Sequence, residues 1–171
     1  MRSRTGFVSL SCYYLLTFFL LGCDKGIQPT QAGGGGGAGT MTGLITYRNW
    51  PTIDSLHDLR IIAFRLFPPT NVVNEVLQGR AIVYPSLGDT SLVPFFVDSL
   101  RYSFTLASGT YQYVVIAQQF GPSVTTDWRP VGQFDLDSNL TQPSTVDIVA
   151  GEATAGIDIL VDFANPPPAP F

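Results

Sequence analysis

The only histidine of the sequence, His57, stands between a hydroxyl and a carboxylate in the segment Ser55-Leu56-His57-Asp58. These are the three groups of a hydrolase that activates a serine. In an extended segment His57 and Asp58 point to opposite faces, and the sequence has no Gly-x-Ser-x-Gly turn. We therefore expect a surface histidine and a protein that is not an enzyme and has no cofactor. A glycosidase-like pair of acids stays open, because its spacing is set only by the fold.

A second candidate for chemistry is the acidic turn Asp135-Leu136-Asp137-Ser138-Asn139. Asp135, Asp137 and Asn139 place three oxygen ligands at alternate positions, as the first half of a calcium loop does. The central glycine and the final glutamate of such a loop are missing. We therefore expect an acidic turn without a metal, and we keep these three residues as weak candidates for a hard-cation site.

The two tryptophans stand in segments that resemble loops, Asn49-Trp50-Pro51 and Asp127-Trp128-Arg129-Pro130. An exposed indole beside an acid can stack on a sugar ring or grip a peptide. A half-buried indole can instead close the end of a hydrophobic core. We favour the second interpretation and retain Trp50 and Trp128 as candidate ligand contacts.

Residues 1–22 have the three parts of an export signal. Arg2 and Arg4 supply the positive charge, and an uncharged apolar stretch follows from Phe7 to Leu21. It is about 15 residues long, whereas a membrane-spanning helix needs about 20. The alternative interpretation is an uncleaved signal anchor that is followed by Gly22 and Cys23 only by chance.

Leu20-Leu21-Gly22-Cys23 resembles the lipobox of bacterial lipoproteins. The resemblance implies cleavage between Gly22 and Cys23 and attachment of fatty acyl chains, such as palmitate, to Cys23. Such chains hold a domain at a membrane, because each buried methylene contributes about 0.8 kcal/mol. We therefore expect a location in the cell envelope, on the periplasmic side or at the cell surface. Asp24 resembles the inner-membrane retention signal of enteric bacteria, but other phyla use different rules, so the choice of membrane stays open.

The lipidated cysteine is followed by a glycine-rich stretch, so residues 23–40 are predicted to be a flexible linker. Five consecutive glycines, Gly33 to Gly37, offer no side chains to pack and lose much entropy on ordering. This segment would separate a folded domain at 41–163 from the membrane. Residues 164–171 are rich in proline and are predicted to be an exposed, extended tail.

Composition limits the function classes open to this chain of 171 residues. It is 45% hydrophobic and 13% charged, which is too apolar for a disordered protein. Without Arg2 and Arg4 the chain has seven basic and 13 acidic side chains, a formal charge of −6. No basic stripe is present, so we expect no nucleic-acid partner. Cys12 and Cys23 are the only cysteines, so no disulfide is expected in the folded domain.

Alternation of apolar and polar residues predicts an all-β domain. Two segments are apolar on both faces and are expected to be central strands. We predict a single antiparallel β-sandwich of about seven to nine strands. The expected strands are 43–48, 59–67, 80–84, 92–97, 101–106, 111–120, 131–136, 145–149 and 156–163; the central ones are 59–67 and 111–120, and one short helix is expected at 71–78.

Three short motifs resemble those of carboxypeptidase regulatory-like and transthyretin-like sandwiches. They are the hairpin at 106–115 with Gly109 in its turn, the opening strand at 43–47, and the closing turn at 149–152. The resemblance implies an Ig-like or transthyretin-like fold and a non-catalytic accessory role. We therefore expect an envelope lipoprotein that presents loops or a sheet edge to a protein partner. A carbohydrate- or cation-binding module is the alternative, with a glycan as partner, and a small hydrolase comes third.

Overall fold

The computed structural model describes residues 36–87, 89–137 and 139–170. The predicted export signal, Cys23 and most of the predicted linker lie outside these residues. The described chain contains ten strands, one α-helix and one 3₁₀ turn, which confirms the all-β prediction. The elements are β1 (Ala38–Arg48), η1 (Ile53–Ser55), β2 (Asp58–Phe64), α1 (Val72–Leu77), β3 (Ala81–Tyr84), β4 (Ser99–Ala107), β5 (Gly109–Tyr111), β6 (Tyr113–Gln119), β7 (Trp128–Gln133), β8 (Val146–Ile148), β9 (Ala153–Thr154) and β10 (Ile159–Asp162).

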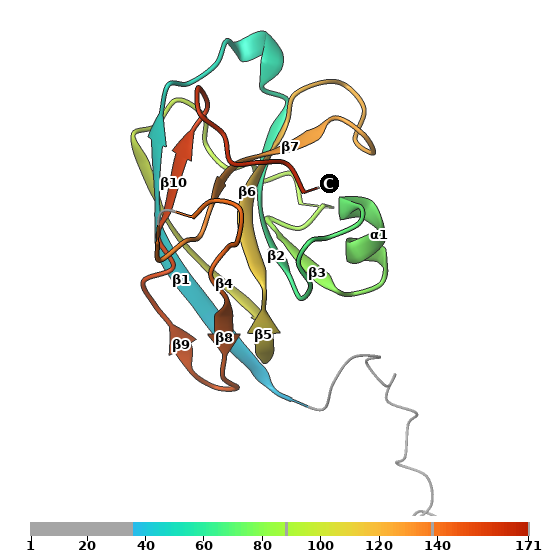
Figure 1. The fold of residues 1–171 in the computed structure, drawn as a ribbon, viewed down its shortest axis with the longest axis vertical. Coiled ribbons are helices and arrows are strands. Elements are labelled where there is room, and N and C mark those ends of the chain that lie inside the picture. Colours follow the sequence, from blue (N-terminus) through green and yellow to red (C-terminus); the bar gives the residue numbers. More distant parts are fainter. Residues whose placement is uncertain (1–35, 88, 138, 171) are drawn as a thin grey trace, which may run out of the picture. The chain divides into compact units, whose positions relative to one another are not determined.

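Most strands belong to one curled sheet that forms a half-barrel. Its strand order is β3-β2-β6-β7-β10-β1-β4, with β9 added beside β1. A separate ladder joins β5 to β8 (Figure 1). The rings of Tyr84 on β3 and Phe104 on β4 stack with their centroids 4.8 Å apart. The curl therefore brings the two edge strands of the sheet close enough for their side chains to meet.

The predicted antiparallel arrangement is wrong at β1. This strand runs parallel to β10, with Ile45 opposite Ile159, and parallel to β9. The sheet is therefore mixed, and a single curled sheet stands where two facing antiparallel sheets were expected. The parallel pair joins the first and the last strand of the sheet along the chain. No local pattern in the sequence signals such a contact, because alternation gives the face of a strand but not its neighbour.

The two strands predicted to be central are central. Every residue of β6 is buried, and in β2 only Asp58 is partly exposed. Their inward residues join the main core, and their outward residues form a second apolar cluster that contains Phe64 and Tyr113. Partly buried side chains of α1 and Trp128 pack against this outer cluster. The helix prediction at 71–78 is confirmed, and α1 covers one half of the outer face.

Several predicted strands are shifted at their ends: β1 begins at Ala38, inside the predicted linker, and β7 spans Trp128–Gln133 instead of 131–136. Two predicted strands differ more. Residues 92–97 form no strand, because Pro94 cannot donate to a ladder and Phe96 adopts a positive φ of 58°. Val93 from this segment is buried in the main core. The strand predicted at 111–120 is interrupted at Gln112, so Tyr111 pairs with β8 and the central strand begins at Tyr113.

The C-terminal segment is exposed at positions 164–166, 168 and 169, as predicted, but it is buried at Pro167. The carboxylate of Asp162 accepts a hydrogen bond from the backbone N–H of Ala164 at 3.0 Å, and Asn165 N–H donates to the Asp162 carbonyl at 3.1 Å. These bonds turn the chain directly after β10. Pro167 is consequently buried against the domain.

Replacing Gly43 with alanine is expected to destabilise the parallel end of the sheet. A Cβ at this position would overlap the backbone carbonyl of Ile157 and would lie 3.0 Å from Cε1 of Tyr102. Backbone cannot yield as a flexible side chain does, so the free energy of unfolding should fall by about 3 kcal/mol, the upper end for overpacking. Urea denaturation followed by tryptophan fluorescence measures this change. Thr42→Ala is the control and should cost less than about 1 kcal/mol; equal losses would contradict the prediction.

Candidate functional site

The outer face of the curled sheet has an uncovered half with a groove of about 530 Å³. Its floor is formed by outward residues of β1, β7 and β10, including Leu44, Gln133 and Leu160. One wall is the loop after β7, and the C-terminal segment contributes Asn165 and Pro167. Figure 1 shows this segment leaving the end of β10 and crossing in front of the sheet. The groove has the volume of a small-ligand site.

The groove combines an apolar floor with acidic sides. Leu160 is 49% exposed and Leu140 is 45% exposed, so apolar surface is open to solvent at its base. Four aspartates line it against one arginine; they are Asp135, Asp137, Asp158 and Asp162, with Arg48 as the arginine. Such a surface attracts a ligand that carries both positive charge and apolar groups.

Two of these aspartates are held in place by hydrogen bonds. The Asp158 carboxylate accepts a hydrogen bond from the backbone N–H of Leu44 at 2.8 Å, which ties the start of β10 to β1. The Asp162 carboxylate accepts from the side-chain amides of Asn49 at 2.8 Å and Asn165 at 3.2 Å. These hydrogen bonds lower the pKa of the Asp162 carboxyl from its ordinary value. Asp162 therefore remains charged in mildly acidic solution.

The acidic turn proposed as a weak cation site uses its side chains locally. Asp135 accepts from Ser144 Oγ at 3.0 Å, Asp137 accepts from the Asn139 N–H at 2.6 Å, and Asn139 accepts from the Thr141 N–H at 3.2 Å. These side chains support successive turns of the loop wall. Within the described ranges, no group of three or more His, Cys, Asp or Glu residues could hold a metal ion.

Trp50 closes one end of the main core. Its indole lies 4.7 Å from the rings of both Tyr47 and Phe163 and 5.3 Å from that of Phe96. Its N–H donates to the carbonyl of Val97 at 3.0 Å. The indole is surrounded by rings and its donor is used, so the geometry fits the core-capping interpretation.

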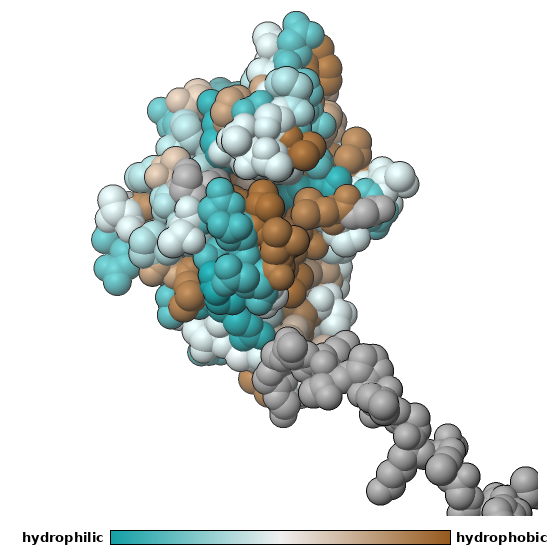
Figure 2. Space-filling view, turned by 90° about the vertical axis from the view of Figure 1, so that its right-hand side faces the viewer, coloured by the Kyte–Doolittle hydropathy of each residue, from teal (hydrophilic) through white to brown (hydrophobic). Residues whose placement is uncertain are grey.

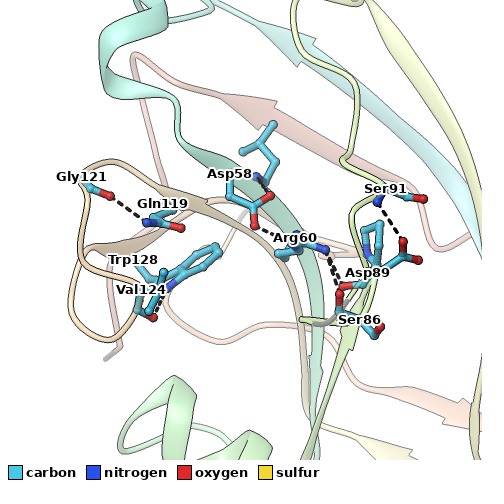
Figure 3. Close-up of polar contacts among 11 residues, drawn as sticks. Asp58, Arg60, Ser86, Asp89, Ser91, Gln119, Gly121, Val124 and Trp128 are labelled. Atoms are coloured by element: carbon cyan, nitrogen blue, oxygen red, sulfur yellow. Dashed lines mark hydrogen bonds and ion pairs between the residues drawn. The ribbon is translucent and has the colours of Figure 1, made fainter.

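Trp128 lies on the other half of the outer face. Its N–H donates to the carbonyl of Val124 at 2.9 Å, within the loop that joins β6 to β7 (Figure 3). The indole borders a small apolar pocket of about 30 Å³ beside α1, together with Val76 and Leu87. Figure 2, viewed from the side that carries α1 in Figure 1, shows hydrophobic residues along the middle of this face. Trp50 packs with the core and Trp128 with the outer cluster, so the two candidate ligand contacts do not form one site.

The segment around His57 does not assemble a triad. Ser55 Oγ donates to the Thr52 carbonyl at 3.0 Å, and the Asp58 carboxylate binds Arg60 at 2.6 Å. His57 is exposed. The Ser55 hydroxyl and the Asp58 carboxylate therefore both bond to groups other than the His57 imidazole.

The groove could not be recognised as a site from the sequence. Asp135 and Asp137 stand out there as parts of one turn, whereas Asp158 and Asp162 carry no local motif. Both of the latter stand at the ends of β10, and their outward direction follows from alternation in that strand. That β10 lies beside β7 and β1, however, is a property of the sheet order alone.

Comparison with known proteins assigns no family to the chain. No protein-family model and no curated protein matches the sequence. Among solved structures, a leucine-rich repeat protein from Bacteroides thetaiotaomicron is similar over 75% of this chain, with 10% identity and a TM-score of 0.35. The matched part spans only 14% of that protein. Among the described residues, no helix is both long and apolar enough to cross a membrane.

Proposed function

We propose that this chain is a lipid-anchored, non-catalytic binding module of the bacterial cell envelope. Its acidic groove would bind a basic, partly apolar segment of a partner protein. The observation that carries this proposal is the groove itself, in which four aspartates surround exposed leucines on the half of the outer sheet face that α1 does not cover.

The anchor is supported by the sequence at the chain's start. Positive charge, a short apolar stretch and Gly22-Cys23 occur in the order that a lipoprotein signal requires. Acyl chains on Cys23 would hold the domain near a membrane, and the glycine-rich segment would leave its orientation free. An anchored module of this kind can search for a partner along the membrane surface.

We also propose that the domain is a divergent relative of the transthyretin-like sandwiches. Support comes from the turn glycines, since Gly109 and Gly151 have positive φ angles of 123° and 76°. Side chains rarely adopt these conformations, so glycine is the residue that such turns require. The parallel pairing of β1 with β10 is the main departure from the expected antiparallel arrangement.

Neutralising two groove carboxylates is expected to weaken the binding of a basic peptide. The probe is a short synthetic peptide of alternating lysine and leucine, which matches the acidic sides and the leucine floor. Asp137→Asn with Asp158→Asn keeps both side-chain oxygens that accept backbone hydrogen bonds. The dissociation constant measured by calorimetry should rise about three- to tenfold, since an exposed ion pair contributes roughly 0.2–1 kcal/mol.

The matched control removes the same charge elsewhere. Asp54 and Asp98 are exposed and lie outside the groove. Asp54→Asn with Asp98→Asn should leave the dissociation constant within about twofold of the original. A peptide that does not bind, or an equal loss in both double variants, would refute a specific basic-peptide groove.

A further inference from the structure

We propose that the free edge of β4 pairs with the same edge of a second copy of this chain, which joins two half-barrels through one continuous sheet. This inference concerns the strand at the end of the sheet and is independent of the proposed groove.

The register between β1 and β4 shows which backbone groups face outward. Thr40 N–H donates to Glu152, Thr42 accepts from Ile157, and Leu44 N–H donates to Asp158, so these residues of β1 turn away from β4. Directly opposite residues in antiparallel strands either exchange hydrogen bonds or both turn away from the pair. Their β4 partners therefore direct both N–H and C=O toward the free edge; these are Thr105, Ser103 and Arg101, respectively.

The outward groups of this edge have no partner within the described part of the chain. Among the described residues, β1 is the only neighbour of β4 in the sheet, and no other hydrogen bond reaches the backbone of Arg101, Ser103 or Thr105. All three residues are exposed. The next outward carbonyl, that of Ala107, is occupied by Arg65 and Tyr111 side chains. The open edge therefore ends before Ala107.

Several of the usual protections of an edge strand are missing from β4. Proteins block such edges with prolines, bulges, very short strands, charged side chains or a covering segment. Here nine residues pair with β1 in unbroken register, without proline. Near the middle of β4 the solvent-exposed side chains are those of Ser103 and Thr105, which are small and carry hydroxyls. Arg101 is the only charged residue of the strand. The inward residues Tyr102 and Phe104 are buried in the core.

A second copy fits this edge by symmetry and by charge. With the twofold axis at Ser103, each Arg101 lies opposite Thr105 of the other copy. The two arginines are then about 13 Å apart along the strands, which exceeds the screening length of about 8 Å at physiological salt. Two serines meet at the centre without a steric conflict. About six backbone hydrogen bonds form across the three central pairs.

Ser103→Pro tests this interface because the monomer should tolerate it. Proline is accepted at an edge position whose N–H faces solvent, but it removes the central donor and places a ring in the interface. The full chain, extracted from membranes, is analysed by sedimentation in density-matched detergent. The original protein should show a concentration-dependent doubling of protein mass, and Ser103→Ala should retain it. Ser103→Pro should remain a monomer at concentrations where the original is mainly dimeric.

Amide hydrogen exchange keeps the test decisive if the proline variant fails to fold. In the original protein, exchange at Arg101, Ser103 and Thr105 should slow at least about tenfold as the dimer forms. The buried residues between them should change little, because β1 already protects their amides. A protein that stays monomeric with fast exchange at these three amides, or a folded Ser103→Pro variant that dimerises as strongly as the original, would overturn the proposal. If the edge instead pairs with a strand of a different protein, the isolated chain would stay monomeric with fast exchange at these three amides.

Discussion

Replacing Cys23 with serine is expected to abolish lipid attachment and to leave the export signal uncleaved. Serine lacks the thiol that would receive the acyl chains, and the resemblance to lipoproteins implies that cleavage follows lipidation. Cells grown with a labelled palmitate analogue should label the original protein. The Cys23→Ser chain should lose at least about nine-tenths of the label and accumulate as a precursor that retains residues 1–22.

The chain provides its own control for this experiment. Cys12 is the other cysteine, and it lies within the predicted signal. Cys12→Ser should keep full labelling and normal cleavage, because that cysteine is removed with the signal. Label that persists in Cys23→Ser, or that disappears in Cys12→Ser, would show that Cys23 is not the attachment point.

Asp58→Ala is expected to cost the folded domain about 3–5 kcal/mol. Its carboxylate lies 2.6 Å from Nε of Arg60, and the two side chains are only 13% and 5% exposed, respectively. Arg60 also donates to the carbonyls of Pro85 at 3.0 Å and Ser86 at 3.1 Å (Figure 3). Removal of the acid leaves a buried guanidinium with neutral acceptors alone. Breaking a buried ion pair from one side has a cost of this size.

A second substitution separates this cause from general damage to the strand. Arg60→Met in the Asp58→Ala background removes the unpaired charge and leaves an apolar side chain against the outer cluster. The double variant should regain at least about half of the lost stability in urea denaturation. Asp54→Ala removes an exposed acid nearby and should change stability by no more than about 0.5 kcal/mol. A loss below about 1 kcal/mol in Asp58→Ala would contradict this account of the pair.

The sequence predicts those parts of the fold that depend on local pattern. The segments of β2 and β6 can be recognised as central because both of their faces are apolar, and the short helix predicted at 71–78 is α1. The parallel β1–β10 pair could not be predicted, since Ile45 and Ile159 meet only after the whole chain has folded. The segment at 92–97 was misassigned because its alternating apolar residues fill the core without making a ladder.

The residues of the candidate site, too, can be predicted together only where they are close in sequence. Asp135 and Asp137 were recognised together because they share one turn. Asp158 and Asp162 join them only through the sheet order, which places β10 between β7 and β1. The tryptophans were visible in the sequence, but composition does not tell a ring that faces solvent from one that closes a core. The role of Trp50 in closing the core is visible only from the positions of Tyr47 and Phe163, whose rings lie against its indole.

Intact mass spectrometry of the protein extracted from its native membrane decides whether Cys23 carries a lipid anchor. We expect a chain that begins at Cys23, with the mass of two or three acyl chains linked to that residue and none elsewhere. A protein that retains Met1 to Gly22 and carries a free thiol at Cys23 would contradict the account of a lipid-anchored module.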